Sequence, residues 1–172
     1  MSPLTARSVS MALLGGIATV LLYSQGLLVW AGFVAWAAFL EAGGDTAALK
    51  TTIAGNLFGA CVAWVALTVT LHIPVPSEGA AWILRAGALV AVTLPLLVMG
   101  TRIALFSRAS TNLLGYAAMF GAVAIAIPVV TILDRLQSFH LYNPLIVVAL
   151  SMITGAVFGL LSNKLTEALT KK

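Results

Sequence analysis

Amides and hydroxyls are the side chains with hydrogen-bonding chemistry inside the apolar segments of this chain. Asn56 and Asn112 are the amides, and hydroxyls accompany them at Thr52, Thr68, Ser151 and Thr154. A pore for small polar molecules needs such hydrogen-bond partners together with an apolar constriction. The pattern therefore predicts contact with a small, uncharged solute, although packing between membrane helices uses the same amides and stays open as an interpretation.

An aromatic stripe precedes these amides. Trp30, Phe33 and Trp36 follow one another at intervals of three residues, so on a helix they form a stripe that drifts slowly around the axis. The stripe would supply the constriction, or its tryptophans would anchor a helix end at the membrane surface. The predicted pore or solute-binding residues are Trp30, Phe33, Trp36, Asn56 and Asn112.

Groups that carry out catalysis are missing from the interior of the predicted segments. The sequence has no His-Glu-x-x-His pattern, and the middle of every segment lacks Asp, Glu, Lys, Arg and His, which argues against an enzyme and against a proton relay. His72 and His140 fall at segment ends, where solvation is favoured over a shared metal or pH site. Cys61 is the single cysteine, so it forms no intrachain disulfide and packs as a small residue. We expect no catalytic residue, metal or cofactor.

Composition places the chain in a membrane. Of its 172 residues, 61% are hydrophobic and 8% are charged, whereas a soluble domain is roughly 25% charged. The nine Lys and Arg residues are scattered between apolar blocks rather than gathered into a stripe, which argues against nucleic acid as a partner. The lipid bilayer is the expected surrounding.

The first apolar run must fold back on itself. The 33 uncharged residues from Ser8 to Leu40 would make a helix of about 50 Å against a hydrocarbon core of roughly 30 Å. The polar turn from Tyr23 to Gly26 divides the run into two short pieces, about Val9 to Leu22 and Leu27 to Leu40. The second piece is either a short helix or a re-entrant half-helix, and both forms must lie inside the assembly.

Four further segments complete the prediction. They cover residues 46–72, 80–100, 109–133 and 144–163. Fold class is therefore an all-α integral membrane protein, a bundle of six transmembrane segments in one domain, 1–172. Pro95 and Pro128 lie inside segments and would kink them.

Two helix starts carry capping signals. Asn143 precedes Pro144, which suits the first turn of a helix. Asp45 and Thr46 precede the third segment, where a carboxylate matches the helix dipole. A cytoplasmic entrance vestibule is the alternative role for this acidic turn.

Six segments place both termini on one side, and the basic residues predict which side. Seven Lys and Arg residues fall on the terminal side and two, Arg85 and Arg135, on the other. The excess predicts that both termini are cytoplasmic.

Glycine patterns recur along the chain. Gly-x-x-Phe-Gly occurs at Gly55–Gly59 and again at Gly155–Gly159, and each is a small-xxx-small helix-packing face. A weaker echo links the segments that begin at Gly32 and Gly115, so a 3+3 inverted repeat is one interpretation. The offsets of 100 and 83 residues differ, and the motifs fall early in one segment and late in the other. Chance similarity is therefore the preferred interpretation.

Short motifs along most of the chain resemble a known family. These are Trp-Ala-Gly-Phe at residues 30–33, the double glycine 43–44, Leu-Lys at 49–50 and the Gly155–Gly159 motif. In that order they resemble domain of unknown function 1097, a family of small bacterial inner-membrane proteins. The resemblance implies a multi-pass inner-membrane protein and no particular reaction or substrate.

Two functions follow as hypotheses. The first is a channel or facilitator for a small, neutral solute, working as a homo-oligomer. The second is a structural or regulatory subunit whose glycine faces pack against partner membrane helices.

Overall fold

A computed structural model describes residues 1–73, 80–126 and 131–170, apart from the side chains of Trp82, Ile125 and Ala126. These ranges contain helices and turns and no strand. The elements are α1 (Pro3–Ser24), α2 (Val29–Glu41), α3 (Thr46–Leu71), α4 (Ala80–Gly100), the 3₁₀ turn η1 (Ala104–Phe106), α5 (Ala109–Ala126), α6 (Ile132–Gln137) and α7 (Pro144–Thr170).

Four of these helices are long and apolar enough to cross a membrane: α1, α3, the Ile83–Gly100 part of α4, and α7. The prediction of an all-helical, multi-pass membrane protein is confirmed at this level. Helix α2 has 13 residues, which corresponds to about 20 Å of a hydrocarbon core of roughly 30 Å. Its buried side chains show that α2 lies inside the bundle, as expected for a short segment.

The first helix is longer than predicted. Ser2 caps it, with its Oγ accepting a hydrogen bond from the Thr5 N–H at 3.2 Å, and Pro3 opens the first turn. The helix therefore includes Arg7 and reaches 22 residues. The predicted break is confirmed, since Gly26 turns the chain at φ 66°. The second segment is then one uninterrupted short helix.

The fifth predicted segment is wrong at its C-terminal end. Helix α5 ends at Ala126, and Ile132 and Leu133 belong to the separate helix α6. Two side chains favour this short helix, because Trp64 Nε1 and Asn143 Nδ2 donate to the Leu136 carbonyl at 2.8 and 3.0 Å. Pro128 lies outside the described residues, and α4 continues through Pro95 to Gly100.

Both predicted caps are confirmed. The Ala48 N–H donates to Asp45 Oδ1 at 2.7 Å at the start of α3. The Leu145 N–H donates to Asn143 Oδ1 at 2.8 Å at the start of α7. Helix α7 then continues to Thr170, beyond the predicted end at Asn163.

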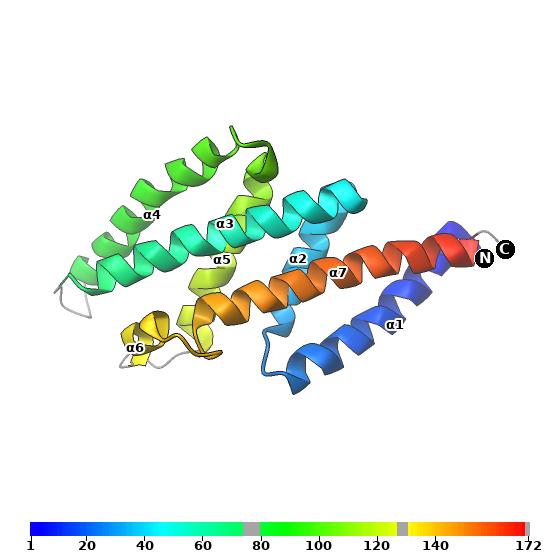
Figure 1. Ribbon diagram of the computed structural model, residues 1–172, viewed down its shortest axis with the longest axis horizontal. Helices are drawn as coiled ribbons and strands as arrows, with labels where there is room; N and C mark the ends of the chain where they lie inside the picture. The colour runs from blue at the N-terminus through cyan, green and yellow to red at the C-terminus, as the bar shows by residue number, and fades with distance from the viewer. Residues whose placement is uncertain (74–79, 127–130, 171–172) are drawn as a thin grey trace.

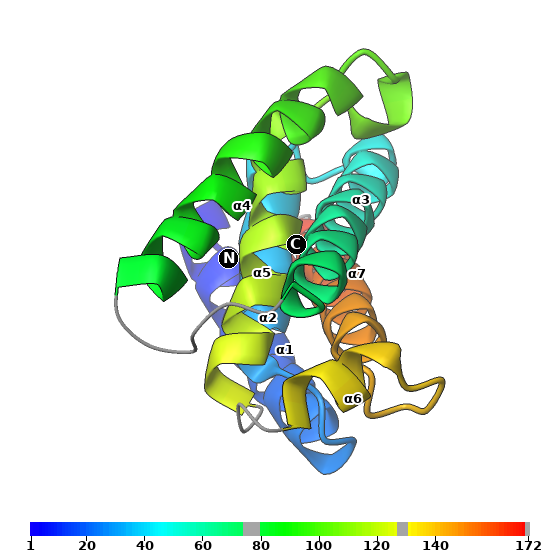
Figure 2. The same ribbon diagram turned by 90° about the vertical axis from the view of Figure 1, so that its left-hand side faces the viewer.

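Helices α3 and α7 form the long axis of the molecule and run in opposite directions (Figure 1). Asn163 near the end of α7 donates to the Gly44 carbonyl at the start of α3, at 2.9 Å. The chain termini lie together at one end, where the Met1 amino group approaches the Leu169 carbonyl at 3.5 Å. Figure 2 shows α5 packed beside α3 and α4, with α2 behind α5.

Glycines allow the central helices to touch backbone to backbone. A Cβ added to Gly155 of α7 would meet the carbonyl oxygen of Gly32 in α2. A Cβ added to Gly59 of α3 would meet the carbonyl oxygen of Asn112, and one added to Gly115 of α5 would meet the carbonyl oxygen of Asn56. The molecule therefore has two glycine crossings, defined as α2 on α7 at Gly32 and Gly155, and α3 on α5 at Gly59 and Gly115.

The two Gly-x-x-Phe-Gly motifs occupy similar places in their helices. Gly55 is the tenth residue of α3 and Gly155 is the twelfth of α7. The prediction that one motif lies early and the other late in its segment is wrong, because α7 extends to Thr170. Since α3 and α7 run in opposite directions, equal distances from their starts correspond to opposite depths.

We expect Gly59→Ala to destabilise the protein by about 1–3 kcal/mol, the usual cost of overpacking a tight interior. Its methyl group would lie on the Asn112 carbonyl, and relief requires α3 and α5 to separate. The free energy of unfolding in mixed micelles with increasing dodecyl sulfate measures this. Gly16→Ala in α1 is the control, because a Cβ there meets nothing within 4 Å. Equal stability of Gly59→Ala and wild type would contradict the crossing.

Candidate functional site at the glycine crossings

Thr52 and Asn56 lie one turn apart on the same face of α3, at the level of the glycine crossings. Both side chains are buried, with exposed fractions of 0% and 1%. Among the described residues, neither the amide atoms of Asn56 nor the Thr52 hydroxyl has a hydrogen-bond partner. Each unpaired buried group of this kind costs about 1–3 kcal/mol. The two side chains therefore offer a hydroxyl and an amide to a small polar molecule placed between them.

The amide nitrogen of Asn112 bonds two neighbouring segments, and its amide oxygen faces α3. Its Nδ2 donates to the carbonyls of Leu97 and Phe106, each at 3.0 Å. Leu97 lies in the last turn of α4, where carbonyls lack partners within the helix. The Oδ1 atom lacks a partner among the described residues, and a Cβ on Gly55 would lie 2.8 Å from it. Asn112 therefore ties α5 to α4 and η1 and directs its oxygen toward α3.

The aromatic stripe divides among three neighbouring helices. Trp30, 37% exposed, lies over Gly121 of α5, and Phe33, 43% exposed, lies over Gly15 of α1. Trp36 is buried against Gly159 of α7, and its ring stacks on Phe33 with centroids 5.9 Å apart. Trp36 Nε1 has no hydrogen-bond partner among the described residues. Only Trp36 of the stripe is therefore fully enclosed.

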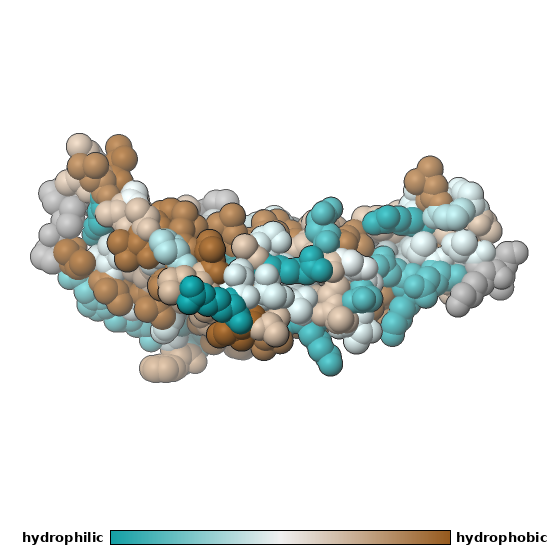
Figure 3. All heavy atoms as spheres, turned by 90° about the horizontal axis from the view of Figure 1, so that it is seen from above, coloured by the Kyte–Doolittle hydropathy of each residue, from teal (hydrophilic) through white to brown (hydrophobic). Residues whose placement is uncertain are grey.

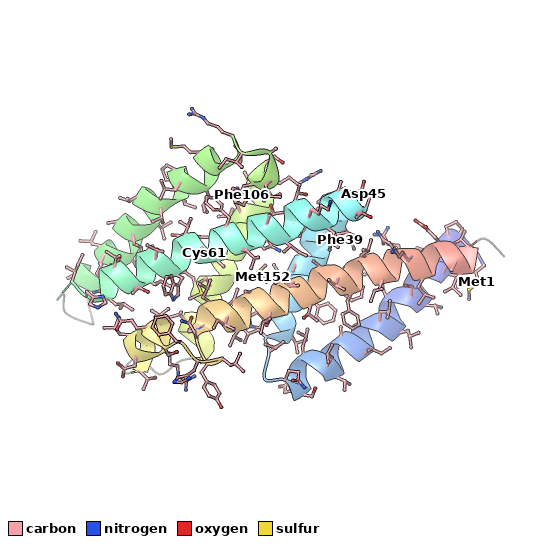
Figure 4. The ribbon with its side chains drawn as sticks, viewed as in Figure 1. Met1, Phe39, Asp45, Cys61, Phe106 and Met152 are labelled. Atoms are coloured by element: carbon pink, nitrogen blue, oxygen red, sulfur yellow. The ribbon has the colours of Figure 1, made fainter. Side chains whose placement is uncertain are left out.

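The apolar interior around these groups closes the site. Phe39 of α2 and Met152 of α7 are buried beside α3, with exposed fractions of 0% and 1% (Figure 4). Five cavities and grooves on the described residues have no lining contribution from Trp30, Phe33, Trp36, Asn56 or Asn112. The structure thus places the predicted residues on neighbouring helices, and none of these five hollows joins them.

Several other polar groups of the interior are paired, although the Thr68 hydroxyl has no partner among the described residues. Ser151 Oγ accepts a hydrogen bond from the Leu28 N–H at 2.9 Å, which gives a partner to a backbone N–H at the start of α2. The Tyr116 hydroxyl lies 2.6 Å from Thr93 Oγ1 and joins α5 to α4. The sequence analysis missed this contact. Its signal was a tyrosine within an apolar segment, because a buried tyrosine hydroxyl usually has a partner.

The Asp, Glu, Lys, Arg and His residues of the described ranges lie near helix ends or between helices. His72 Nδ1 donates to the Thr68 carbonyl at 2.6 Å, and its Nε2 accepts from Gln137 at 3.1 Å. Arg108 donates to the Ala42 carbonyl at the end of α2, at 2.8 Å. His140 is exposed, and the described residues hold no group of three metal-ligating side chains of the His, Cys, Asp and Glu types.

A helical bundle with four candidate spans and a polar interior at the crossings defines a polytopic membrane protein. A family model described as a protein of unknown function, DUF1097, matches residues 8–167. The chain belongs to this family, as the sequence motifs predicted. No curated protein matches it, and no solved structure matches it.

The paired and unpaired amides predict opposite responses to an apolar replacement. We expect Asn56→Leu to leave the stability unchanged or to raise it, because it removes two unsatisfied buried groups. Asn112→Leu should lower the stability by about 1–3 kcal/mol, because it leaves the Leu97 and Phe106 carbonyls unpaired. The same mixed-micelle unfolding measures both. A loss at position 56 as large as at position 112 would show that Asn56 serves packing.

Proposed function

We propose that this protein is a non-enzymatic, six-crossing membrane facilitator for a small, uncharged polar solute. Asn56 carries the proposal: an amide enclosed at the crossing of the central helices whose oxygen and nitrogen both lack partners among the described residues. An asparagine inside a membrane bundle most often serves helix packing through a hydrogen bond, and a buried amide without such a bond is costly. Because Asn56 makes no hydrogen bond among the described residues, packing of that kind does not account for it. With the Thr52 hydroxyl one turn away, the site offers donors and acceptors without charge, which suits a neutral solute.

We further propose that the two halves form an inverted 3+3 repeat, the interpretation that the sequence alone made second to chance similarity, and such a repeat would favour a site at this place. A half-turn about the line of sight in Figure 1 brings α1 toward α4, α2 toward α5 and α3 toward α7. The contacts follow the same relation, since each glycine crossing joins one helix from each half. Within the halves, Phe33 lies over Gly15 between α2 and α1, and Tyr116 bonds Thr93 between α5 and α4. Transporters built this way bind solute at the repeat interface, near mid-membrane.

Entry of a solute requires helix movement. The site is enclosed by Phe39, Met152 and the two backbone contacts, so the described conformation is a closed one. We propose that this movement takes place at the glycine crossings, where backbone meets backbone.

The alternative function is a subunit that docks partner helices. The surfaces that the sequence predicted for docking, the two Gly-x-x-Phe-Gly faces, are not available to a partner. Both Gly-x-x-Phe-Gly faces are covered within the chain, by α5 and by α2 and its aromatic rings. A partner helix or a second copy in a homo-oligomer would have to use the outer faces of α1 or α4, where Gly16 and Gly87 meet nothing within 4 Å. Co-purification of a stoichiometric foreign membrane protein would favour this alternative.

Purified protein in liposomes should increase the flux of small neutral solutes such as urea or glycerol, followed by light scattering after rapid mixing. Thr52→Val and Asn56→Leu should bring the flux close to that of empty vesicles, because they remove the hydrogen bonds offered to the solute. Thr51→Val is the matched control, since Thr51 bonds its own helix at Ala47 and Ala48. Flux equal to empty vesicles for the wild-type protein across a solute panel would overturn the proposal.

We further propose a bacterial inner-membrane location with both termini in the cytoplasm. Figure 3 views the face of the molecule on which α3 begins. Hydrophilic residues gather over the middle of this face and toward the end where the chain termini lie, and hydrophobic residues gather at the opposite end. In a Cys61→Ser background, cysteines placed at Ser2 and at Phe139 should differ. A membrane-impermeant maleimide added to intact spheroplasts should label position 139 and spare position 2. Labelling of position 2 would reverse the orientation.

A further inference from the structure

The same short motif occurs on both helices of the α3–α5 crossing. Asn-Leu-Phe-Gly covers residues 56–59 of α3, and Asn-Leu-Leu-Gly covers residues 112–115 of α5. A Cβ on Gly59 would meet the Asn112 carbonyl oxygen, and a Cβ on Gly115 would meet the Asn56 carbonyl oxygen. Each asparagine therefore lies against the glycine of the other motif, and the two motifs run in opposite directions where their helices cross (Figure 1).

The two amides of these paired motifs differ in their bonding. Asn112 Nδ2 donates to the carbonyls of Leu97 and Phe106, each at 3.0 Å. Asn56 Nδ2 has no partner among the described residues, and the same holds for the amide oxygens of both asparagines, although both side chains are buried. The crossing therefore offers two acceptor oxygens and one donor nitrogen, in addition to the Thr52 hydroxyl.

The hydroxyl that lies against this part of α3 uses its hydrogen elsewhere. A Cβ on Gly55 would meet Thr111 Oγ1, and it would lie 2.8 Å from Asn112 Oδ1. Thr111 Oγ1 donates to the Arg108 carbonyl of its own helix, at 2.9 Å. Under the proposed function, the hydrogens that the two amide oxygens lack come from the solute.

We propose that the solute is a planar amide, urea or a small primary carboxamide, and that it binds between the paired motifs. A primary amide presents a carbonyl oxygen and an N–H side by side, and the Asn56 side chain presents the complementary N–H and oxygen. Two hydrogen bonds then form in one plane, and further N–H groups of the solute remain for Asn112 Oδ1. This assignment rests on the proposed function, because it names the solute class for the same site.

Other small solutes match these groups less well. A polyol also has donors and acceptors, but its hydroxyls rotate, so holding two of them in the plane of the Asn56 amide costs rotamer entropy. A cation would attract the two amide oxygens and repel Asn56 Nδ2, whose N–H groups only donate. Shape favours the amide as well, because the helix backbones touch at Gly59 and Gly115 and a flat molecule needs the least separation between them.

Side-chain amide resonances test this binding without any transport. The chain has four asparagines, Asn56, Asn112, Asn143 and Asn163, so ¹⁵N-asparagine labelling of the detergent-solubilised full chain gives few NH₂ signals, and Asn56→Leu assigns those of Asn56. Urea and acetamide should shift the Asn56 signals to saturation. Ethylene glycol, which has as many heavy atoms as urea, should bind about ten-fold more weakly, the factor for one hydrogen bond at the upper end of its usual range.

Asn163 supplies the internal reference and the matched control. Its Nδ2 donates to the Gly44 carbonyl at 2.9 Å, so its signals should stay in place at the concentrations used. In liposomes, Asn56→Ser keeps a hydroxyl but loses the adjacent oxygen and N–H, and it should lower the ratio of urea flux to ethylene glycol flux about ten-fold. Asn163→Ser should leave this ratio unchanged. The ratio does not depend on the amount of folded protein, so a merely structural role of Asn56 would not alter it.

The outcomes separate this inference from the proposed function. Absence of a saturable shift with both urea and acetamide, or equal affinity for ethylene glycol, would overturn the amide site even where the liposomes show flux. An unchanged flux ratio in Asn56→Ser would overturn it as well. Saturable shifts without flux above that of empty vesicles would instead overturn the facilitator and support the amide site.

Discussion

Backbone contact at the two glycine crossings is the constraint on which the rest of the bundle depends. In lipid there is no hydrophobic drive to bring helices together, so close packing and interhelical hydrogen bonds must hold them. At Gly32 with Gly155, and at Gly59 with Gly115, an added Cβ would meet a backbone carbonyl. This close approach lets the short helix α2 remain enclosed although it is shorter than an ordinary span.

Close approach at the crossings also determines which polar groups find partners. Hydroxyls and amides near helix ends reach a carbonyl or an N–H that the helix leaves unpaired: Ser151 reaches the start of α2, and Asn112 reaches the end of α4. Thr52 and Asn56 are the seventh and eleventh residues of α3, and both stay unpaired among the described residues. Other hydroxyls inside helices bond the carbonyl four residues earlier, as Thr93 bonds Leu89 and Ser151 bonds Val147, so position in the helix alone does not leave Thr52 unpaired. Under the proposed function, a solute supplies the donors and acceptors that these two side chains lack.

The sequence predicted the membrane class, the apolar segments, the turn at Gly26 and the caps at Asp45 and Asn143, because these follow from local composition and local backbone chemistry. It could not predict that Ile132 and Leu133 belong to a helix of their own, since α6 depends on donors from Trp64 and Asn143 that are distant in sequence. The sequence also predicted Asn56, Asn112 and the aromatic stripe as pore or solute-binding residues. Periodicity alone could not show that Trp30, Phe33 and Trp36 contact three different helices, because that depends on helix packing.

The side of the bundle formed by α3, α4 and α5 and the side formed by α7, α1 and α2 share an arrangement but differ in chemistry, and the proposed solute site lies on the first side. The α3–α5 crossing carries amides and hydroxyls, whereas the α2–α7 crossing is lined by Phe39, Trp36 and Met152. At the periphery, α1 is held to α7 by a serine pair, whereas Ala66 of α3 and Ala88 of α4 line a hollow between their helices. The side of the bundle formed by α3, α4 and α5 therefore combines polar groups in its interior with an outer helix that leaves hollows beside it. Movement of α4 would have to break the hydrogen bonds of Thr93 with Tyr116, of Asn112 with Leu97 and of Arg85 with Ile73.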